Sequence, residues 1–199
     1  TDQNITVDSG TVSVDNANLL DATTTGTVTA SIDTTETVDE LNTLSGTGNA
    51  YTIVIAAGDA TGSTAAEFNT INGATSVAVD ASAVTGLASD TISNIKTLLT
   101  AGNDTAQFSS DSFSSLATAA VSDSSLSVAD LTGAIDQANT ATGGTNTIFS
   151  LNSGATVNGG TATNFTALLA SETASQVSIT DQNLNVDSGT ITVANARAL

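Results

Sequence analysis

Short runs in which apolar and polar residues alternate recur along the chain and predict β-strands. In each run Val, Ile or Tyr alternates with Thr, Ser or Asp, as in a strand with one buried face. Ser, Thr, Asn, Asp and Gly fill the intervals and favour turns. The predicted strands are residues 5–7, 12–14, 28–32, 51–56, 76–80, 147–151 and 177–179.

A second pattern predicts helix N-termini: Ser or Thr, an acid three residues later, and then an apolar residue. The hydroxyl can accept a hydrogen bond from the first helical turn, and the acid interacts favourably with the helix dipole. The pattern occurs at Thr37 and Glu40, at Thr64 and Glu67, and at Ser127 and Asp130. Leu41 and Phe68, which follow two of the acids, are expected in the core.

One longer helix is predicted at residues 90–100, where Ile92, Ile95, Leu98 and Leu99 fall on one stripe. The chain therefore alternates a strand, a turn and a short helix every ~20–30 residues, a spacing found in stacked repeats. We expect a mainly β fold with short helices, a parallel β-solenoid of roughly seven or eight coils. An antiparallel β-sandwich adhesin domain is the alternative.

A 20-residue segment occurs twice. Residues 1–20 read TDQNITVDSGTVSVDNANLL and residues 180–199 read TDQNLNVDSGTITVANARAL, identical at 13 of 20 positions and separated by 179 residues. We expect residues 1–179 to be one long repeat that forms a solenoid segment, and residues 180–199 to begin the next copy in a tandem array. A single domain whose two end strands are duplicates is the alternative.

Composition excludes several classes of active site. The 199 residues include no His, Cys, Met, Trp or Pro, one Tyr and five Phe. Without His or Cys there is no Ser/His/Asp or Cys/His triad and no zinc site with nitrogen or sulfur ligands. Phosphate-binding glycine loops are also missing from the sequence. We therefore expect a chain that is not an enzyme.

The formal net charge of −18 changes the expected partners. Such a surface repels nucleic acids and anionic lipids and attracts cations. Calcium is the best candidate cofactor, since it prefers carboxylate and carbonyl oxygens. The candidate ligands lie in acidic turns: Asp8, Asp21, Asp104, Asp111 and Asp187. No apolar run reaches the ~18 residues that span a membrane.

Two further motifs have a simple structural interpretation. Asp-Ser-Gly-Thr at residues 8–11 and 187–190 matches the aspartic protease signature, but both copies belong to the duplicated segment. We interpret each as a turn, in which Asp accepts backbone N–H groups and Gly adopts positive φ. Sequons for glycosylation occur at Asn4, Asn103 and Asn164.

The phrases Glu-Leu-Asn-Thr-Leu-Ser-Gly (40–46) and Phe-Asn-Thr-Ile-Asn-Gly (68–73) carry a family resemblance. The chain resembles the Thr/Ala/Gly/Asp-rich repeats of large secreted bacterial surface proteins: RTX-like adhesins, S-layer proteins and giant cyanobacterial cell-surface proteins. It departs from them where Gly143-Gly144 and Gly159-Gly160 are followed by Thr, so the calcium-binding nonapeptide is missing.

The resemblance implies an extracellular, cell-surface location and a non-catalytic structural role. We expect copies to stack or assemble into a layer, stalk or filament, so that the main partner is the chain itself. An adhesin that binds carbohydrate, such as a cell-surface polysaccharide, is the alternative, and a β-helix enzyme that acts on polysaccharide is a remote one.

Overall fold

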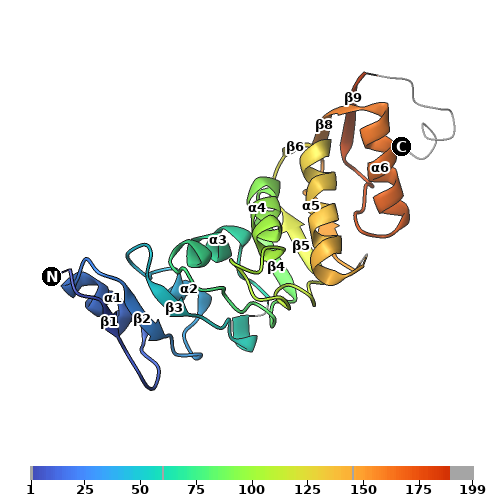
Figure 1. Cartoon of the computed structure of the whole chain (residues 1–199). Helices are drawn as coiled ribbons and strands as arrows, with labels where there is room; N and C mark the ends of the chain where they lie inside the picture. The colour runs from blue at the N-terminus through green and yellow to red at the C-terminus, as the bar shows by residue number, and fades with distance from the viewer. Residues whose placement is uncertain (1, 60, 145, 189–199) are drawn as a thin grey trace.

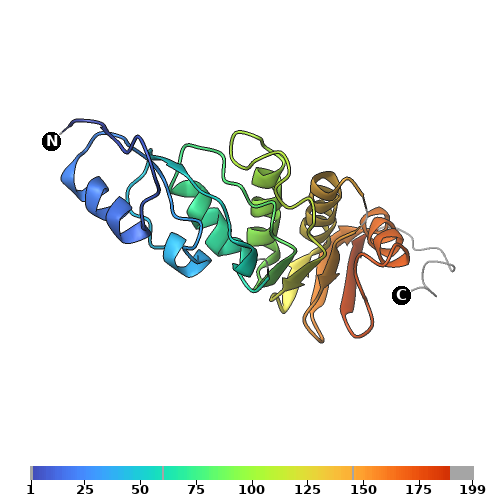
Figure 2. The same ribbon diagram turned by 90° about the horizontal axis from the view of Figure 1, so that it is seen from below.

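The chain forms an elongated row of strand and helix units, with β1 at one end and β9 at the other (Figure 1). This computed structural model describes residues 2–59, 61–144 and 146–188. A view from below shows the units following one another in sequence order along the long axis (Figure 2). The most extensive contacts between elements accordingly join neighbouring units, as between α4 and α5 or β8 and β9.

The described residues contain six α-helices: α1 (Val14–Thr23), α2 (Val38–Leu41), α3 (Ala65–Gly73), α4 (Ile92–Gly102), α5 (Val128–Thr142) and α6 (Ala162–Thr173). One 3₁₀ turn, η1, covers Ala57–Asp59. The strands are β1 (Ile5–Thr6), β2 (Val28–Ser31), β3 (Ala50–Thr52), β4 (Gly86–Asp90), β5 (Thr118–Val121), β6 (Ser125–Ser127), β7 (Ile148–Ser150), β8 (Thr156–Thr161) and β9 (Asn183–Ser188).

The strands pair into three small parallel sheets, with the orders β1-β2-β3, β4-β5-β7 and β6-β8-β9. Ile5 lies opposite Val28 in the first sheet, and Val157 lies opposite Leu184 in the third. Parallel strands need a crossover between them, and the helices supply most of it here. Every pairing between described strands is parallel, as the alternation of strand and helix indicates.

The expected fold class, a mainly β parallel solenoid of roughly seven or eight coils, is wrong. The described residues form three separate three-stranded sheets and six helices instead. The alternative β-sandwich is wrong as well, because it needs antiparallel strands. Strands here have only two to six residues, whereas helices reach fifteen, so much of each crossover is helical. Among the described residues, the β-pairing outside these strands consists of isolated bridges, such as Val54 with Asp80.

Most of the predicted helix signals are confirmed. Thr37 and Thr64 form capping boxes with Glu40 and Glu67, and Ser127 caps α5. The predicted helix at residues 90–100 is α4, and its apolar stripe is buried. The strand predicted at residues 12–14 is wrong, because Ser13 accepts a hydrogen bond from the Asn16 N–H and begins α1 at Val14.

The core follows the row of units and consists of Val, Ile, Leu and Ala with six aromatic rings. Leu41 and Phe68 are buried, as predicted. Phe113 packs edge-on against Phe68 and Phe108, with ring centroids 6.0 and 5.1 Å away. Phe113 has a positive φ of 59°, an uncommon conformation for a bulky residue, and its burial within this cluster holds the conformation in place.

Candidate functional site

Acidic side chains bind the N-termini of helices in the preceding unit. The first backbone N–H groups of a helix have no partner within the helix, and an anion nearby also interacts favourably with its dipole. Three carboxylates fill this place across units: Glu36 accepts from the Val14 N–H of α1 at 3.2 Å, Asp90 from Ala66 of α3 at 2.7 Å, and Asp123 from Ile92 of α4 at 2.6 Å. Each bond ties two neighbouring units together.

Asp90 makes the most complete of these contacts. It ends β4 and is only 9% exposed. Besides the Ala66 N–H, its carboxylate accepts the Thr91 N–H at 2.7 Å and the Asn94 side-chain amide at 2.8 Å. A buried carboxylate is costly unless it is fully hydrogen-bonded, and here three donors satisfy it. Asp90 is therefore a structural residue that joins β4, α3 and α4.

Amide side chains repeat the connection at the C-terminal ends of the helices. An Asn in the last turn or at the cap of one helix bonds a Gln 34–37 residues later. The pairs are Asn72 with Gln107 at 3.0 Å, Asn103 with Gln137 at 2.7 Å, and Asn139 with Gln176 at 2.5 Å. Both ends of the helical layer are therefore tied from unit to unit by side chains.

Asp21, one of the predicted calcium ligands, belongs to a similar contact in the first units. Its carboxylate accepts from the Asn49 amide at 2.8 Å and from the Ser45 hydroxyl at 3.2 Å. Gly46 lies so close that a Cβ there would be 2.3 Å from the carboxylate oxygen, and its φ is +80°. The close approach of the loop thus requires glycine at this position.

The other four predicted ligands lie in separate segments. Asp8 follows β1, Asp111 lies in a turn before β5, and Asp187 is in β9; all three are exposed. Asp104 follows α4 and accepts the Gln107 side-chain amide and the Ala106 N–H, which lower the pKa of its carboxyl below 3.8. Within the described residues, no three acidic side chains gather into a group that could hold a metal ion. The calcium prediction stays a prediction.

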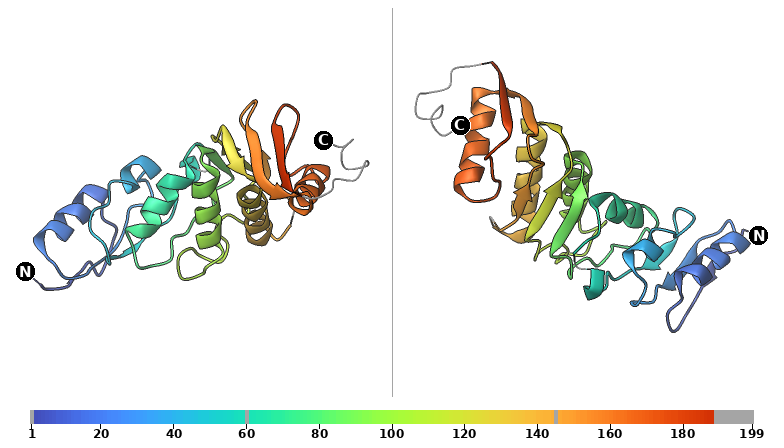
Figure 3. Two further views of the ribbon diagram at one scale, coloured as in Figure 1. Left: turned by 90° about the horizontal axis from the view of Figure 1, so that it is seen from above. Right: turned by 180° about the vertical axis from the view of Figure 1, so that it is seen from behind.

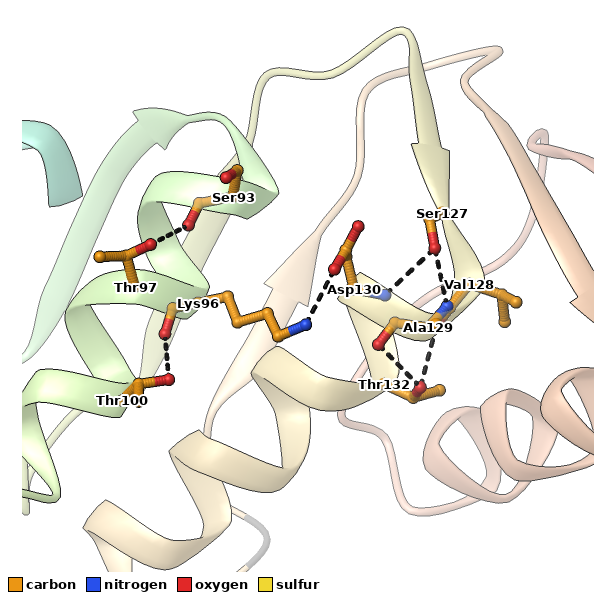
Figure 4. A network of polar contacts seen from close by, with 9 residues as sticks. All are labelled: Ser93, Lys96, Thr97, Thr100, Ser127, Val128, Ala129, Asp130 and Thr132. Atoms are coloured by element: carbon orange, nitrogen blue, oxygen red, sulfur yellow. Dashed lines mark hydrogen bonds and ion pairs between the residues drawn. The ribbon is translucent and has the colours of Figure 1, made fainter.

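A shallow groove between α4 and α5 contains Lys96, whose Nζ lies 2.8 Å from the Asp130 carboxylate (Figure 4). Gly133 lets the lysine side chain approach α5, since a Cβ there would be 3.2 Å from Lys96 Cε. Both charged side chains are at least 40% exposed, and such exposed pairs contribute only about 0–1 kcal/mol.

The two threonine hydroxyls of this groove donate to their own helix. Thr97 donates to the Ser93 carbonyl at 2.8 Å and Thr100 to the Lys96 carbonyl at 2.7 Å (Figure 4). Nucleophilic catalysis needs a hydroxyl or amine held against a base. Here the lysine is paired with a carboxylate and both threonine hydroxyls bond the backbone, so these groups make structural contacts.

The remaining sequence motifs also have local structural roles. Gly10, in the first Asp-Ser-Gly-Thr segment, has a φ of +80°, as expected of a turn; Gly189 and Thr190 of the second copy lie outside the described residues. All three sequon asparagines make hydrogen bonds: Asn4 with the Thr27 N–H, Asn103 with Gln137, and Asn164 with the capping Thr161.

Sequence reasoning missed the ties between units. The acids Glu36 and Asp90 each stand directly before a capping threonine, Thr37 and Thr91, and this repeated pair of residues was a usable signal. Asp123 does not stand before a capping residue, so no local sequence signal indicates its contact with the N-terminus of α4. The Asn and Gln partners are likewise too far apart in sequence to be paired without the structure.

Within the described residues, every helix is too short or too polar to cross a lipid bilayer. No protein family, curated protein or solved structure matches the chain.

Proposed function

We propose that the chain is a non-catalytic structural segment of an extracellular surface protein, and that copies of it associate into a layer, stalk or filament. The observation that carries this proposal is that polar side chains of one unit form hydrogen bonds with the neighbouring unit. The buried or half-buried carboxylates and amides that elsewhere form active sites are here bonded to the neighbouring unit.

Such ties favour a load-bearing role, because they fix neighbouring units at the N-termini of α1, α3 and α4 and at the C-terminal ends of α3, α4 and α5. Their donors and acceptors satisfy one another, so the contacts do not depend on a ligand. The strongly acidic surface keeps a long, repetitive protein soluble and discourages binding to nucleic acid. Zero Cys and zero Met leave no sulfur to oxidise, which suits exposure outside the cell.

Burial of the aromatic rings makes a carbohydrate-binding adhesin the weaker candidate. Sugar-binding faces commonly present aromatic rings, but Tyr51 and all five Phe of this chain are at most 1% exposed. The Tyr51 hydroxyl lies 3.4 Å from the Ala17 carbonyl oxygen, and burial, with a smaller effect of Asp21, raises its pKa to about 12. The rings therefore serve the core, and none of them is available on the surface to stack on a sugar.

Electron microscopy of a protein with two consecutive 179-residue periods tests the proposal. We expect rods, filaments or lattices whose abundance rises with protein concentration. Imaging in calcium and in a chelator, at matched ionic strength, separates assembly that needs calcium from assembly that does not. Compact, isolated particles under both conditions would contradict the structural role and favour a monomeric binding domain.

A further inference from the structure

The duplicated segment is seen at both ends of the molecule, each time with a different neighbour. Residues 2–9 contain β1, which lies at the edge of its sheet and pairs with β2. Their duplicates are residues 181–188, of which Asn183–Ser188 form β9 at the other end, where β9 pairs with β8 (Figure 3). The first copy therefore contacts the unit that follows it in the chain, and the second copy contacts the unit that precedes it.

The backbone hydrogen bonds of the two copies use opposite edges of the strand. The N–H groups of Ile5 and Val7 donate to the Thr27 and Thr29 carbonyls, so odd positions of β1 face β2. In β9 the N–H of Asn183, the duplicate of Asn4, donates to the Ala155 carbonyl at 2.8 Å. Neighbouring residues of a strand point their N–H groups to opposite sides. The same strand can therefore pair with both neighbours at once.

The asparagine side chain shows the same division. Asn4 Oδ1 accepts from the Thr27 N–H of the following unit at 3.0 Å. The duplicate, Asn183, instead donates through Nδ2 to the Gly154 carbonyl of the preceding unit at 3.3 Å. One amide has both an acceptor and a donor, so the two contacts do not compete.

The two residues before this asparagine extend the contact with the preceding unit. Asp181 Oδ2 accepts from the Ser153 hydroxyl at 2.6 Å, and Gln182 Nε2 donates to the Asn152 carbonyl at 3.0 Å. Gln182 also bonds Asp181, as Gln3 bonds Asp2 in the first copy. Asp2 and Gln3 therefore share with their duplicates the hydrogen bond between the two side chains.

The apolar side chains of β1 and β9 each have a neighbouring strand on one side. Ile5 lies opposite Val28, and its duplicate Leu184 lies opposite Val157; both Ile5 and Leu184 are only half-buried. Val28 and Val157, which lie in strands that are paired on both sides, are fully buried. A strand placed between Val157 and Val28 would bury its own apolar residue in the same way.

We propose that residues 2–9 of a second copy of this chain bind the edge of β8 in the register of β9, so that β6, β8, β1, β2 and β3 form one continuous parallel sheet across two copies. This inference rests on the proposed function and names the surface through which copies join. The two duplicates compete for a single place, between β8 of one copy and β2 of the next. One of them must leave when two chains join.

Disulfide trapping tests this register, because the chain has no cysteine of its own. Position 156 lies opposite 183, the duplicate of 4. Adjacent strands are about 4.8 Å apart, within the range that a disulfide bridges. One chain carries Thr156→Cys with Leu184→Asp and Val186→Asp, which release β9 from β8; its partner carries Asn4→Cys. We expect a disulfide-linked dimer with the bond between positions 156 and 4.

Two matched controls make the result specific. Thr163→Cys, at an exposed position on α6, replaces Thr156→Cys and should lose the dimer. Ile5→Asp with Val7→Asp in the Asn4→Cys partner should also lose it, because two charges would enter the apolar contact. If the β9 variant loses the helical circular dichroism signal, Asn183→Pro replaces it, since this change removes the N–H that donates to Ala155 and the side-chain amide that donates to Gly154, and adds no charge.

A folded β9 variant that gives no link between positions 156 and 4, or links position 163 equally well, overturns the proposed register. The result also separates the two proposals. Filaments without this link would leave the structural role standing and place the junction elsewhere. The link without filaments would establish the junction while the larger assembly failed.

Discussion

Asp90 is the residue through which β4, α3 and α4 are held together, and its removal should be costly. Asp90→Ala would leave the Ala66 and Thr91 N–H groups and the Asn94 amide without their acceptor. We expect the free energy of unfolding to fall by about 2–3 kcal/mol. Urea unfolding followed by circular dichroism measures it.

The matched control for Asp90 is Asp136→Ala, at an exposed position on α5. It removes the same charge and side chain but touches none of the ties between units. Its effect should stay within about 0.5 kcal/mol. Equal losses for the two variants would show that net charge, and not the buried contact, accounts for the effect of Asp90→Ala.

The carboxyl of Asp80 should make the free energy of unfolding depend on pH. Hydrogen bonds from the Ser82 hydroxyl and backbone lower the pKa of its carboxyl below 3.8. A carboxyl whose pKa is lower in the folded state stabilises the fold above its unfolded pKa, and this contribution is lost as pH falls through the folded value. The parent should therefore exceed Asp80→Asn in stability at pH 6, and the difference should shrink below pH 3.8.

Urea titrations at several pH values measure the difference between parent and Asp80→Asn. Other carboxylates titrate over the same range, but they do so in both proteins and largely cancel. Asp136→Asn shows the effect of losing one surface charge. A difference between parent and Asp80→Asn that stays constant from pH 6 to pH 3 would contradict the role given to the Ser82 contacts.

At the scale of elements, two glycines in equivalent places should respond oppositely to alanine. Gly73 ends α3 with open space around it, whereas a Cβ on Gly102, the last residue of α4, would lie 2.7 Å from the Phe113 ring. Gly73→Ala should stabilise the chain by up to about 1 kcal/mol through lost chain entropy. Gly102→Ala should destabilise it by about 1–3 kcal/mol, because the buried ring has no room to move.

Thermal unfolding of these two variants and the parent gives the comparison. The sign of the difference is the informative quantity, since both substitutions are the same chemical change at the same position of a helix. A stabilised Gly102→Ala variant would mean that Phe113 repacks easily, and that its positive φ is not enforced by the aromatic cluster.

Helices were predictable from the sequence where their signals are local. The capping box at Thr64 and the stripe of Ile92, Ile95 and Leu98 depend on residues within one or two turns. Strands were less predictable, because β-pairing depends on neighbours 20 or more residues away. At Val12–Val14 both signals were present, and the Ser13 cap decided in favour of the helix.

At the scale of the molecule, charge repulsion should make stability rise with salt. The net charge is −18, and the exposed Lys96–Asp130 pair offsets little of it. Raising NaCl from about 0.01 M to about 0.15 M shortens the screening length from about 30 Å to about 8 Å. We expect Tm to rise by about 2–4 °C, equivalent to about 1 kcal/mol for a chain of this length.

Calcium at matched ionic strength distinguishes a specific site from screening. A further rise in Tm that saturates with calcium would support ligands among the predicted aspartates, and Asp104→Asn and Asp111→Asn would locate them. A rise equal to that in NaCl would leave screening as the sufficient cause. A Tm that falls with NaCl would show that attractive charge contacts outweigh repulsion in this fold.

The overall arrangement was only partly accessible from sequence. Alternation of strand and helix indicated parallel pairing, which the three sheets have. The division into separate sheets was not predictable, because between the sheets the parallel pairing is reduced to isolated bridges such as Val54 with Asp80. The contact of Asp123 with α4 is equally dependent on the final fold.

The row of parallel strands has a mechanical consequence. Hydrogen bonds between strands run along the long axis, so tension applied between the two ends pulls on them directly rather than shearing them. A terminal unit is held by one neighbour and an inner unit by two, so force should detach units singly from the ends. Extension would then proceed in many small, reversible steps, and a surface layer made of such segments would stretch before it broke.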